Sequence, residues 1–213
     1  MDEQQRLESI RRASAAPRLD PETVRAAQQP VLQALARAGF PSDDLSSFAR
    51  RYAPVPTAAV QILLDELEKT RDDTIREWLA RALTASRCEF PGAALVAAFD
   101  GSKSPLVRWA IANALAETEA SGVEEWLVQR ALDRSLGKAR EMLMLAVARH
   151  LSPERALMVL RQCLPDLPGH VAIGLREIGT PEDAGRLLEA RASAPAWAKK
   201  EIDRSVKLIQ ARA

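Results

Sequence analysis

The chain has 213 residues, of which 47% are hydrophobic and 4% aromatic, and 30 lysines and arginines almost balance 29 aspartates and glutamates. The formal net charge is +1, and no large block of one sign occurs in the chain. Nucleic acid is therefore a possible partner, but the charge of the chain does not support it. The polar residues 1–6 are unlike a signal peptide, no apolar run could span a bilayer, and two cysteines make no disulfide framework, so we expect a cytoplasmic protein without a membrane partner.

The composition favours helices, because alanine, leucine, arginine and glutamate dominate and runs of β-branched residues are nearly absent. Residues 1–19 are predicted to form an N-terminal capping helix or arm, and residues 20–213 a single domain. In chain order, the expected helical hairpins are 21–38 with 43–52, 57–69 with 73–86, 90–101 with 104–118, 122–135 with 137–151, 153–164 with 168–178, and 181–192 with 195–211. Pro30 lies inside the first long helix and is expected to kink or break it.

Helix starts are marked by a capping side chain before a proline, which needs no backbone N–H at the first helical position. The pairs are Asp20-Pro21, Ser104-Pro105, Ser152-Pro153 and Thr180-Pro181, and Asp72 or Asp73 is expected to cap the helix that follows it. Thr180 and Asp183 also approximate a capping box.

Two sets of small or apolar residues recur along the chain, mostly at intervals of 32 residues. The first set comprises Val31, Leu32, Leu35, Leu63, Leu64, Leu67, Leu95, Val96, Phe99, Leu127, Val128, Ala131, Val159, Leu160, Cys163, Leu187 and Leu188. The second comprises Leu79, Ala82, Leu83, Ile111, Ala114, Leu115, Leu143, Ala146, Val147, Val171, Gly174, Leu175, Ile202, Ser205 and Val206. Within each repeat the spacing places the set on one helical face, and small residues such as Gly174 recur where helices approach closely. A fixed period of this length predicts a solenoid.

The segments 107–115 and 174–183 resemble HEAT repeats, in the short bacterial form whose second helix has a Val-Arg start and an Ala-Leu middle. Ile75-Arg76 and Ala139-Arg140 repeat that start. The resemblance covers residues 55–213 well and 20–52 weakly. It implies an all-α fold, a right-handed α-solenoid of about five to six hairpins, whose second helices line a concave binding face. HEAT repeats serve many functions, so the resemblance defines architecture better than activity.

The residues that could carry chemistry are few. His150 and His170 are expected on neighbouring helices about 20 Å apart, too far to share one metal ion, and Cys163 falls in a core column while Cys88 falls in a loop. Paired carboxylates such as Asp43-Asp44 fall near helix N-termini, where capping explains them. We therefore predict no cofactor, no metal site and no catalytic residue, and whether the chain is an enzyme stays open.

The candidate site lies on columns of the second helices that are not part of the core. Trp78 and Trp126 are assigned to the core and Trp197 to the C-terminal end, whereas Trp109 is expected near the inner surface. The candidate partner-binding residues are Glu77, Arg81, Trp109, Asn113, Glu141, Leu145, Ile173, Arg176, Lys200 and Arg204. Packing of their apolar members between repeats is the alternative interpretation.

These features favour a non-enzymatic protein-binding module, such as an adaptor, inhibitor or assembly factor, whose partner is another protein or a peptide segment. The first alternative is a DNA-binding protein related to HEAT-like alkylpurine DNA glycosylases, with which Trp109 and the basic Arg176, Lys200 and Arg204 are compatible. That class is expected to need a carboxylate beside the tryptophan, where this chain has Asn113. A second alternative, a HEAT-like lyase or chaperone for a bound pigment, has no specific support.

Overall fold

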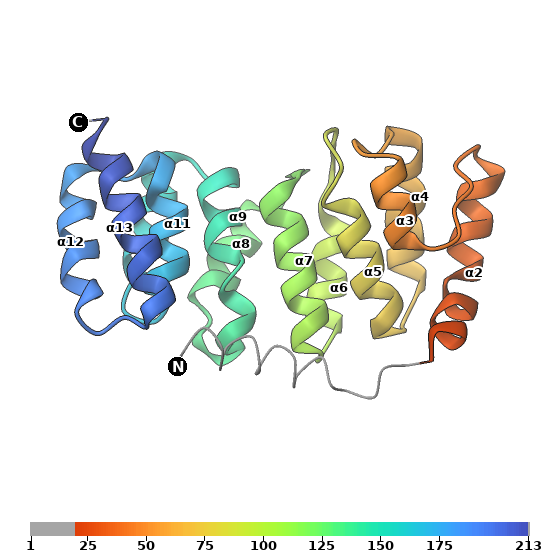
Figure 1. Ribbon diagram of the computed structural model, residues 1–213, viewed down its shortest axis with the longest axis horizontal. Helices are drawn as coiled ribbons and strands as arrows, with labels where there is room; N and C mark the ends of the chain where they lie inside the picture. Colours follow the sequence, from red (N-terminus) through yellow and green to blue (C-terminus); the bar gives the residue numbers. More distant parts are fainter. Residues whose placement is uncertain (1–19, 213) are drawn as a thin grey trace. The chain divides into compact units, whose positions relative to one another are not determined.

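The computed structural model describes residues 20–212, which are helical apart from their connections and one short pair of strands (Figure 1). The prediction of an all-α fold is confirmed for this part of the chain. The predicted capping helix within residues 1–19 lies outside the described residues. The helices make two compact units, α2–α7 and α8–α13, each described by itself.

The first unit consists of two layers of helices (Figure 1). Its helices are α2 (Pro21–Arg37), α3 (Leu45–Arg51), α4 (Thr57–Lys69), α5 (Asp73–Leu83), α6 (Ala93–Gly101) and α7 (Pro105–Glu117). Helix α4 contacts α2 and α6 in the first layer, and α5 contacts α3 and α7 in the second layer. The layers are joined because α4 packs on α5 and α6 packs on α7.

The second unit repeats this arrangement. Its elements are α8 (Glu124–Leu132), the 3-10 helix η1 (Arg134–Arg140), α9 (Leu143–His150), α10 (Pro153–Cys163), α11 (Pro168–Ile178), α12 (Pro181–Arg191) and α13 (Ala196–Gln210). Helix α10 contacts α8, whereas α11 lies between α9 and α13, and α12 packs on α13 (Figure 1).

The predicted columns form the core of both units. Leu79, Ile111 and Leu143 have no exposed surface, and Val171 and Ile202 occupy the same position in the next two helices with the same burial. In the first set Val96 and Val128 are half-buried and Leu188 is 48% exposed. Leu188 lies on α12, the last first-layer helix, so the described residues include no further hairpin to cover it.

In each of three successive hairpins, a recurring arginine donates a hydrogen bond to a backbone oxygen near the end of the hairpin's first helix. Arg76 Nε donates to Thr70 O at 3.1 Å, and Arg108 Nε to Phe99 O at 3.3 Å. Arg140 Nη1 donates to Ala131 O at 3.0 Å. Each acceptor lies at or near the C-terminal end of the preceding first-layer helix, where unpaired carbonyls attract a cation. The recurring Val-Arg start therefore has a structural role within the hairpin.

Helix capping agrees with the sequence at Asp20, Ser104 and Asp72 and in the capping box of Thr180 and Asp183. Asp20 accepts the N–H of Thr23, and Ser104 that of Val107. Asp72 accepts two N–H groups, from Thr74 and Ile75, and so is the cap of α5. Ser152 occupies the capping position of α10 but makes no capping hydrogen bond there. Asp183 accepts both the N–H and the hydroxyl of Thr180.

Two local expectations were wrong. The helix expected from residue 90 begins at Ala93 instead, because strand β1 (Glu89–Pro91) pairs in parallel with strand β2 (Glu119–Ser121). Two successive connections between hairpins run side by side there and satisfy each other's backbone. The helix expected from residue 137 begins at Leu143, after a 3-10 turn in which Gly137 has φ 53°. Of the kink or break expected at Pro30, a break is absent, since α2 continues to Arg37.

Candidate functional site

Four of the ten predicted site residues, Glu77, Arg81, Trp109 and Asn113, lie in the first unit on α5 and α7. Arg81 Nε and Nη2 donate to Glu77 Oε1 at 2.9 and 2.7 Å, since the two residues are one helical turn apart. The Arg81 guanidinium also lies 5.8 Å from the ring centroid of Trp109 on α7. This distance is within the range of a cation–π interaction. The structure therefore joins three of these four residues directly.

Arg81 and Asn113 also line a cavity of about 380 Å³ on the second-layer face of the same unit. The cavity is formed mainly by α3 and α5, with α7 contributing Asn113. Its lining residues are Leu45, Ser46, Ala49, Arg50, Trp78, Arg81, Ala82, Thr84 and Asn113. We call it the α3–α5 cavity.

The charged side chains that line the α3–α5 cavity are both arginines. Arg50 donates to the hydroxyls of Ser46 and Ser47 at 3.2 and 3.1 Å, and these neutral partners do not cancel its charge. Asp44, the N-cap of α3, accepts the N–H of Ser47 at 2.7 Å. This hydrogen bond is the main cause that lowers the pKa of Asp44, and the charge of Arg50 adds to it. Both charged groups of the lining are therefore cations, with Glu77 bonded to Arg81 and Asp44 near Arg50.

Sequence reasoning missed the α3 side of this cavity and the place of Trp78. Trp78 is half-buried and lines the cavity, so its assignment to the core was wrong. A signal was present: one further step of 32 residues back from Glu77 and Arg81 reaches Leu45 and Ala49, both of which line the cavity. The helix expected at 43–52 was short and the repeat was weak there, which hid this continuation.

The other six predicted site residues lie in the second unit, on or next to α9, α11 and α13. Glu141 precedes α9, and its Oε2 lies 3.7 Å from Nε2 of the buried His170 on α11. Leu145 and Ile173 are half-buried. Arg176 donates to Glu201 Oε2 at 2.5 Å, so its charge is compensated within the protein.

The two basic residues of α13, Lys200 and Arg204, are exposed. Trp197, near the start of α13, lies with its ring centroid 5.0 Å from that of His170. A Cβ atom on Gly169 would overlap the Trp197 ring, so the glycine makes room for the indole. His170 and Trp197 thus belong to the packing between α11 and α13.

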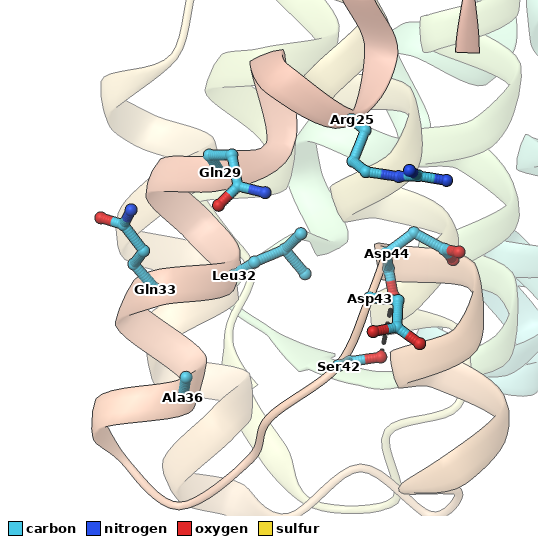
Figure 2. A pocket seen from close by; sticks show the side chains of 8 residues that line it. All are labelled: Arg25, Gln29, Leu32, Gln33, Ala36, Ser42, Asp43 and Asp44. Carbon is cyan, nitrogen blue, oxygen red and sulfur yellow. Dashed lines mark hydrogen bonds between the residues drawn. The ribbon is translucent and has the colours of Figure 1, made fainter. Parts of the chain in front are cut away.

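A larger cavity, of about 570 Å³, lies between α2 and the start of α3 (Figure 2). It is lined by Arg25, Gln29, Leu32, Gln33, Ala36, Ser42, Asp43 and Asp44. Figure 2 shows Leu32 reaching from α2 toward the Ser42–Asp44 segment, whereas Gln33 points away from it. None of the ten predicted residues lines this cavity, it contains no aromatic side chain, and its charges are of both signs.

Within residues 20–212, no group of three or more histidine, cysteine, aspartate or glutamate side chains is arranged to hold a metal ion. Cys163 is buried, and burial raises the pKa of its thiol, whereas Cys88 is partly exposed in a connection between helices. Among the same described residues no helix is long and apolar enough to cross a membrane.

Comparison with known proteins adds no relative: no protein-family model, no curated protein and no solved structure matches the chain.

Proposed function

We propose that this chain is a non-enzymatic protein-binding module of HEAT-like hairpins stacked as a right-handed solenoid, and that its second-layer face binds a segment of another protein. The observation that supports the site most directly is the α3–α5 cavity beside the Arg81–Trp109 contact. Tryptophan and arginine are the residues that most often dominate binding energy at protein interfaces. Here both are half-exposed or exposed next to a cavity.

The geometry supports binding better than catalysis. The charged lining of the α3–α5 cavity is cationic, and the nearest predicted carboxylate, Glu77, is already bonded to Arg81. A general acid–base pair would need a titratable group aimed into the cavity, and the lining offers Arg50, Arg81 and neutral side chains. That the six candidate residues on or next to α9, α11 and α13 bind a partner stays a prediction. The proposed binding site consists of residues on α3, α5 and α7.

The test begins with affinity capture from cells of the source organism, in parallel with wild type, Trp109→Ala and Arg71→Gln. Arg71 is an exposed arginine in the connection between α4 and α5, outside the cavity, and serves as the matched control. A specific partner is a protein retained by wild type and by Arg71→Gln but lost with Trp109→Ala. With that partner purified, we expect Trp109→Ala to weaken binding by at least about 2 kcal/mol in calorimetric titration.

Melting of Trp109→Ala must be measured alongside, because loss of folding would imitate loss of binding. A folded Trp109→Ala protein that captures the same partners as wild type contradicts the site. Binding of duplex DNA with a steep salt dependence would replace the proposal with the DNA-binding alternative.

A further inference from the structure

The residues that line the α3–α5 cavity indicate which chemical group it binds. The inference that follows rests on the proposed function above. We infer that the cavity receives a carboxylate side chain flanked by apolar residues, so that the segment recognised is a short acidic and apolar peptide. The observations that point to it are the two guanidinium groups, the neutral hydrogen-bonding side chains of the lining, and its apolar residues.

Arg50 supplies the cation with unused capacity. A guanidinium has five N–H donors, and the hydrogen bonds of Arg50 go to two serine hydroxyls. Those bonds orient the side chain along α3 without neutralising it. The carboxylate of Asp44 already accepts the N–H and the hydroxyl of Ser47, at 2.7 and 3.1 Å. An incoming carboxylate would therefore gain charge-assisted hydrogen bonds at Arg50 without displacing an existing ion pair.

Arg81 supplies a second, pre-positioned guanidinium. Its Nε and Nη2 are bonded to Glu77 and its planar group lies over Trp109, so little side-chain freedom remains to be lost on binding. The Nη1 atom has no hydrogen bond to another described residue. The hydroxyl of Thr84 donates its proton to the backbone oxygen of Arg81 at 2.6 Å, so that proton is already used within α5.

Neutral groups complete the site. Asn113 reaches the cavity from α7, and among the described residues its side-chain amide has no hydrogen-bond partner, so it is available to the peptide. Leu45, Ala49 and Ala82 together with the ring of Trp78 give an apolar wall. This combination suits one carboxylate next to an apolar side chain.

A polyanion fits less well than a single carboxylate. Residues 20–123 carry 11 arginines and lysines against 14 aspartates and glutamates, a net charge of −3. The two arginines of the lining therefore lie in a unit with excess negative charge, which a phosphodiester backbone running beyond them would meet. A short peptide reaches the two arginines without crossing that surface.

The experiment selects peptides from a phage-displayed library of random dodecapeptides on the immobilised full-length chain. We expect the selected peptides to be enriched in aspartate or glutamate beside leucine or an aromatic residue. For a synthetic selected peptide, Arg50→Gln should raise the Kd about tenfold, measured by fluorescence anisotropy. Replacing the peptide's acidic residue with its amide should have the same effect, and the two changes together should cost no more than either one.

Two further variants serve as controls. Arg50→Lys keeps the charge but not the planar fork and should lose less affinity than Arg50→Gln. Arg71→Gln removes an arginine outside the cavity and should leave the Kd unchanged. All variants are exposed-surface substitutions, and their melting temperatures should match wild type.

The possible failures are distinguishable. If peptides bind and Trp109→Ala abolishes binding, but neutral peptides bind as well as acidic ones and Arg50→Gln has no effect, the carboxylate inference is overturned and the proposed function stands. If no peptide is selected, or selected peptides bind equally to wild type, Trp109→Ala and Arg50→Gln, both are overturned.

Discussion

At the scale of single residues, Asp183 is a carboxylate with no exposed surface at the start of α12. Arg161 on α10 donates two hydrogen bonds to this carboxylate, from Nε to Oδ1 at 2.7 Å and from Nη2 to Oδ2 at 3.0 Å. Burial raises the pKa of Asp183, but hydrogen bonds from Arg161 and from Thr180 outweigh it and leave the pKa below its usual value. The pair connects α10 to the start of the last hairpin.

Arg161→Met should destabilise the protein by about 2–3 kcal/mol at neutral pH, because it leaves a buried carboxylate without its cation. Since the folded pKa of Asp183 lies below the unfolded value, its contribution is complete above about pH 4 and is lost as the pH falls through the folded pKa. Urea unfolding at pH 7 and pH 3 should show a smaller difference between wild type and variant at pH 3.

The matched control for this pair is Arg186→Met. Arg186 bonds Glu182 at 2.7 Å on the exposed side of the same helix, where both side chains are solvated. Its removal should change the stability little at either pH. An equal loss in the two variants would show that the Asp183–Arg161 pair acts as an ordinary surface ion pair.

At the scale of elements, the approach of α11 to α9 depends on Gly174. A Cβ atom at this position would lie 2.8 Å from the backbone oxygen of Met144 on α9 and 3.2 Å from Leu160 on α10. A backbone oxygen cannot move aside as a flexible side chain can, so a methyl group would force the helices apart. Gly185 on α12 faces open space, since a Cβ atom there would have no neighbour within 4 Å.

Gly174→Ala should therefore destabilise the protein by about 1–3 kcal/mol despite the higher helix propensity of alanine. Gly185→Ala, the same change in a neighbouring helix, should stabilise it by about 0.5–1 kcal/mol. Chemical unfolding of both variants measures the two signs. Stabilisation by both would mean that α9 and α11 are farther apart than the structure places them.

The buried columns make a second prediction at this scale. Ile111 has no exposed surface, so Ile111→Ala should cost about 2–5 kcal/mol by opening a cavity in α7. Leu188, which belongs to the other column by sequence, is 48% exposed, and Leu188→Ala should cost less than about 1 kcal/mol. Similar losses at the two positions would show that another part of the protein covers Leu188.

At the scale of the whole molecule, the chain consists of two compact units in which each hairpin packs on its neighbours. A destabilising substitution in one unit should therefore destabilise the helices of that unit more than those of the other unit. In hydrogen-exchange mass spectrometry, Ile111→Ala should lower the protection of α5, α6 and α7 more than that of α11 and α13. Leu143→Ala should show the reverse order. Uniform loss of protection in both variants would mean that the units unfold as one.

Much of the fold could be predicted because its signals are local in the sequence. Each helix needs an apolar face at helical spacing and a cap at its start, and Leu79, Ile111 and Asp72 met those needs where the pattern placed them. The 3-10 turn around Gly137 and the pairing of β1 with β2 were not predictable in this way. Strand pairing depends on which connections lie side by side in the fold. Because the pairing is made by backbone groups, it requires no particular pattern of side chains in the sequence.

The sequence by itself determined the helical class, most of the buried columns and the α5 and α7 residues of the candidate site. Only the tertiary structure decided that Trp78 lines a cavity, that Leu188 is exposed, and that α3 supplies Arg50 to the surface shared with Arg81. The physical reason is that periodicity assigns a residue to a helix face. Whether that face is covered depends on the helix packed against it: α3 leaves a cavity beside α5, and no described hairpin follows α12.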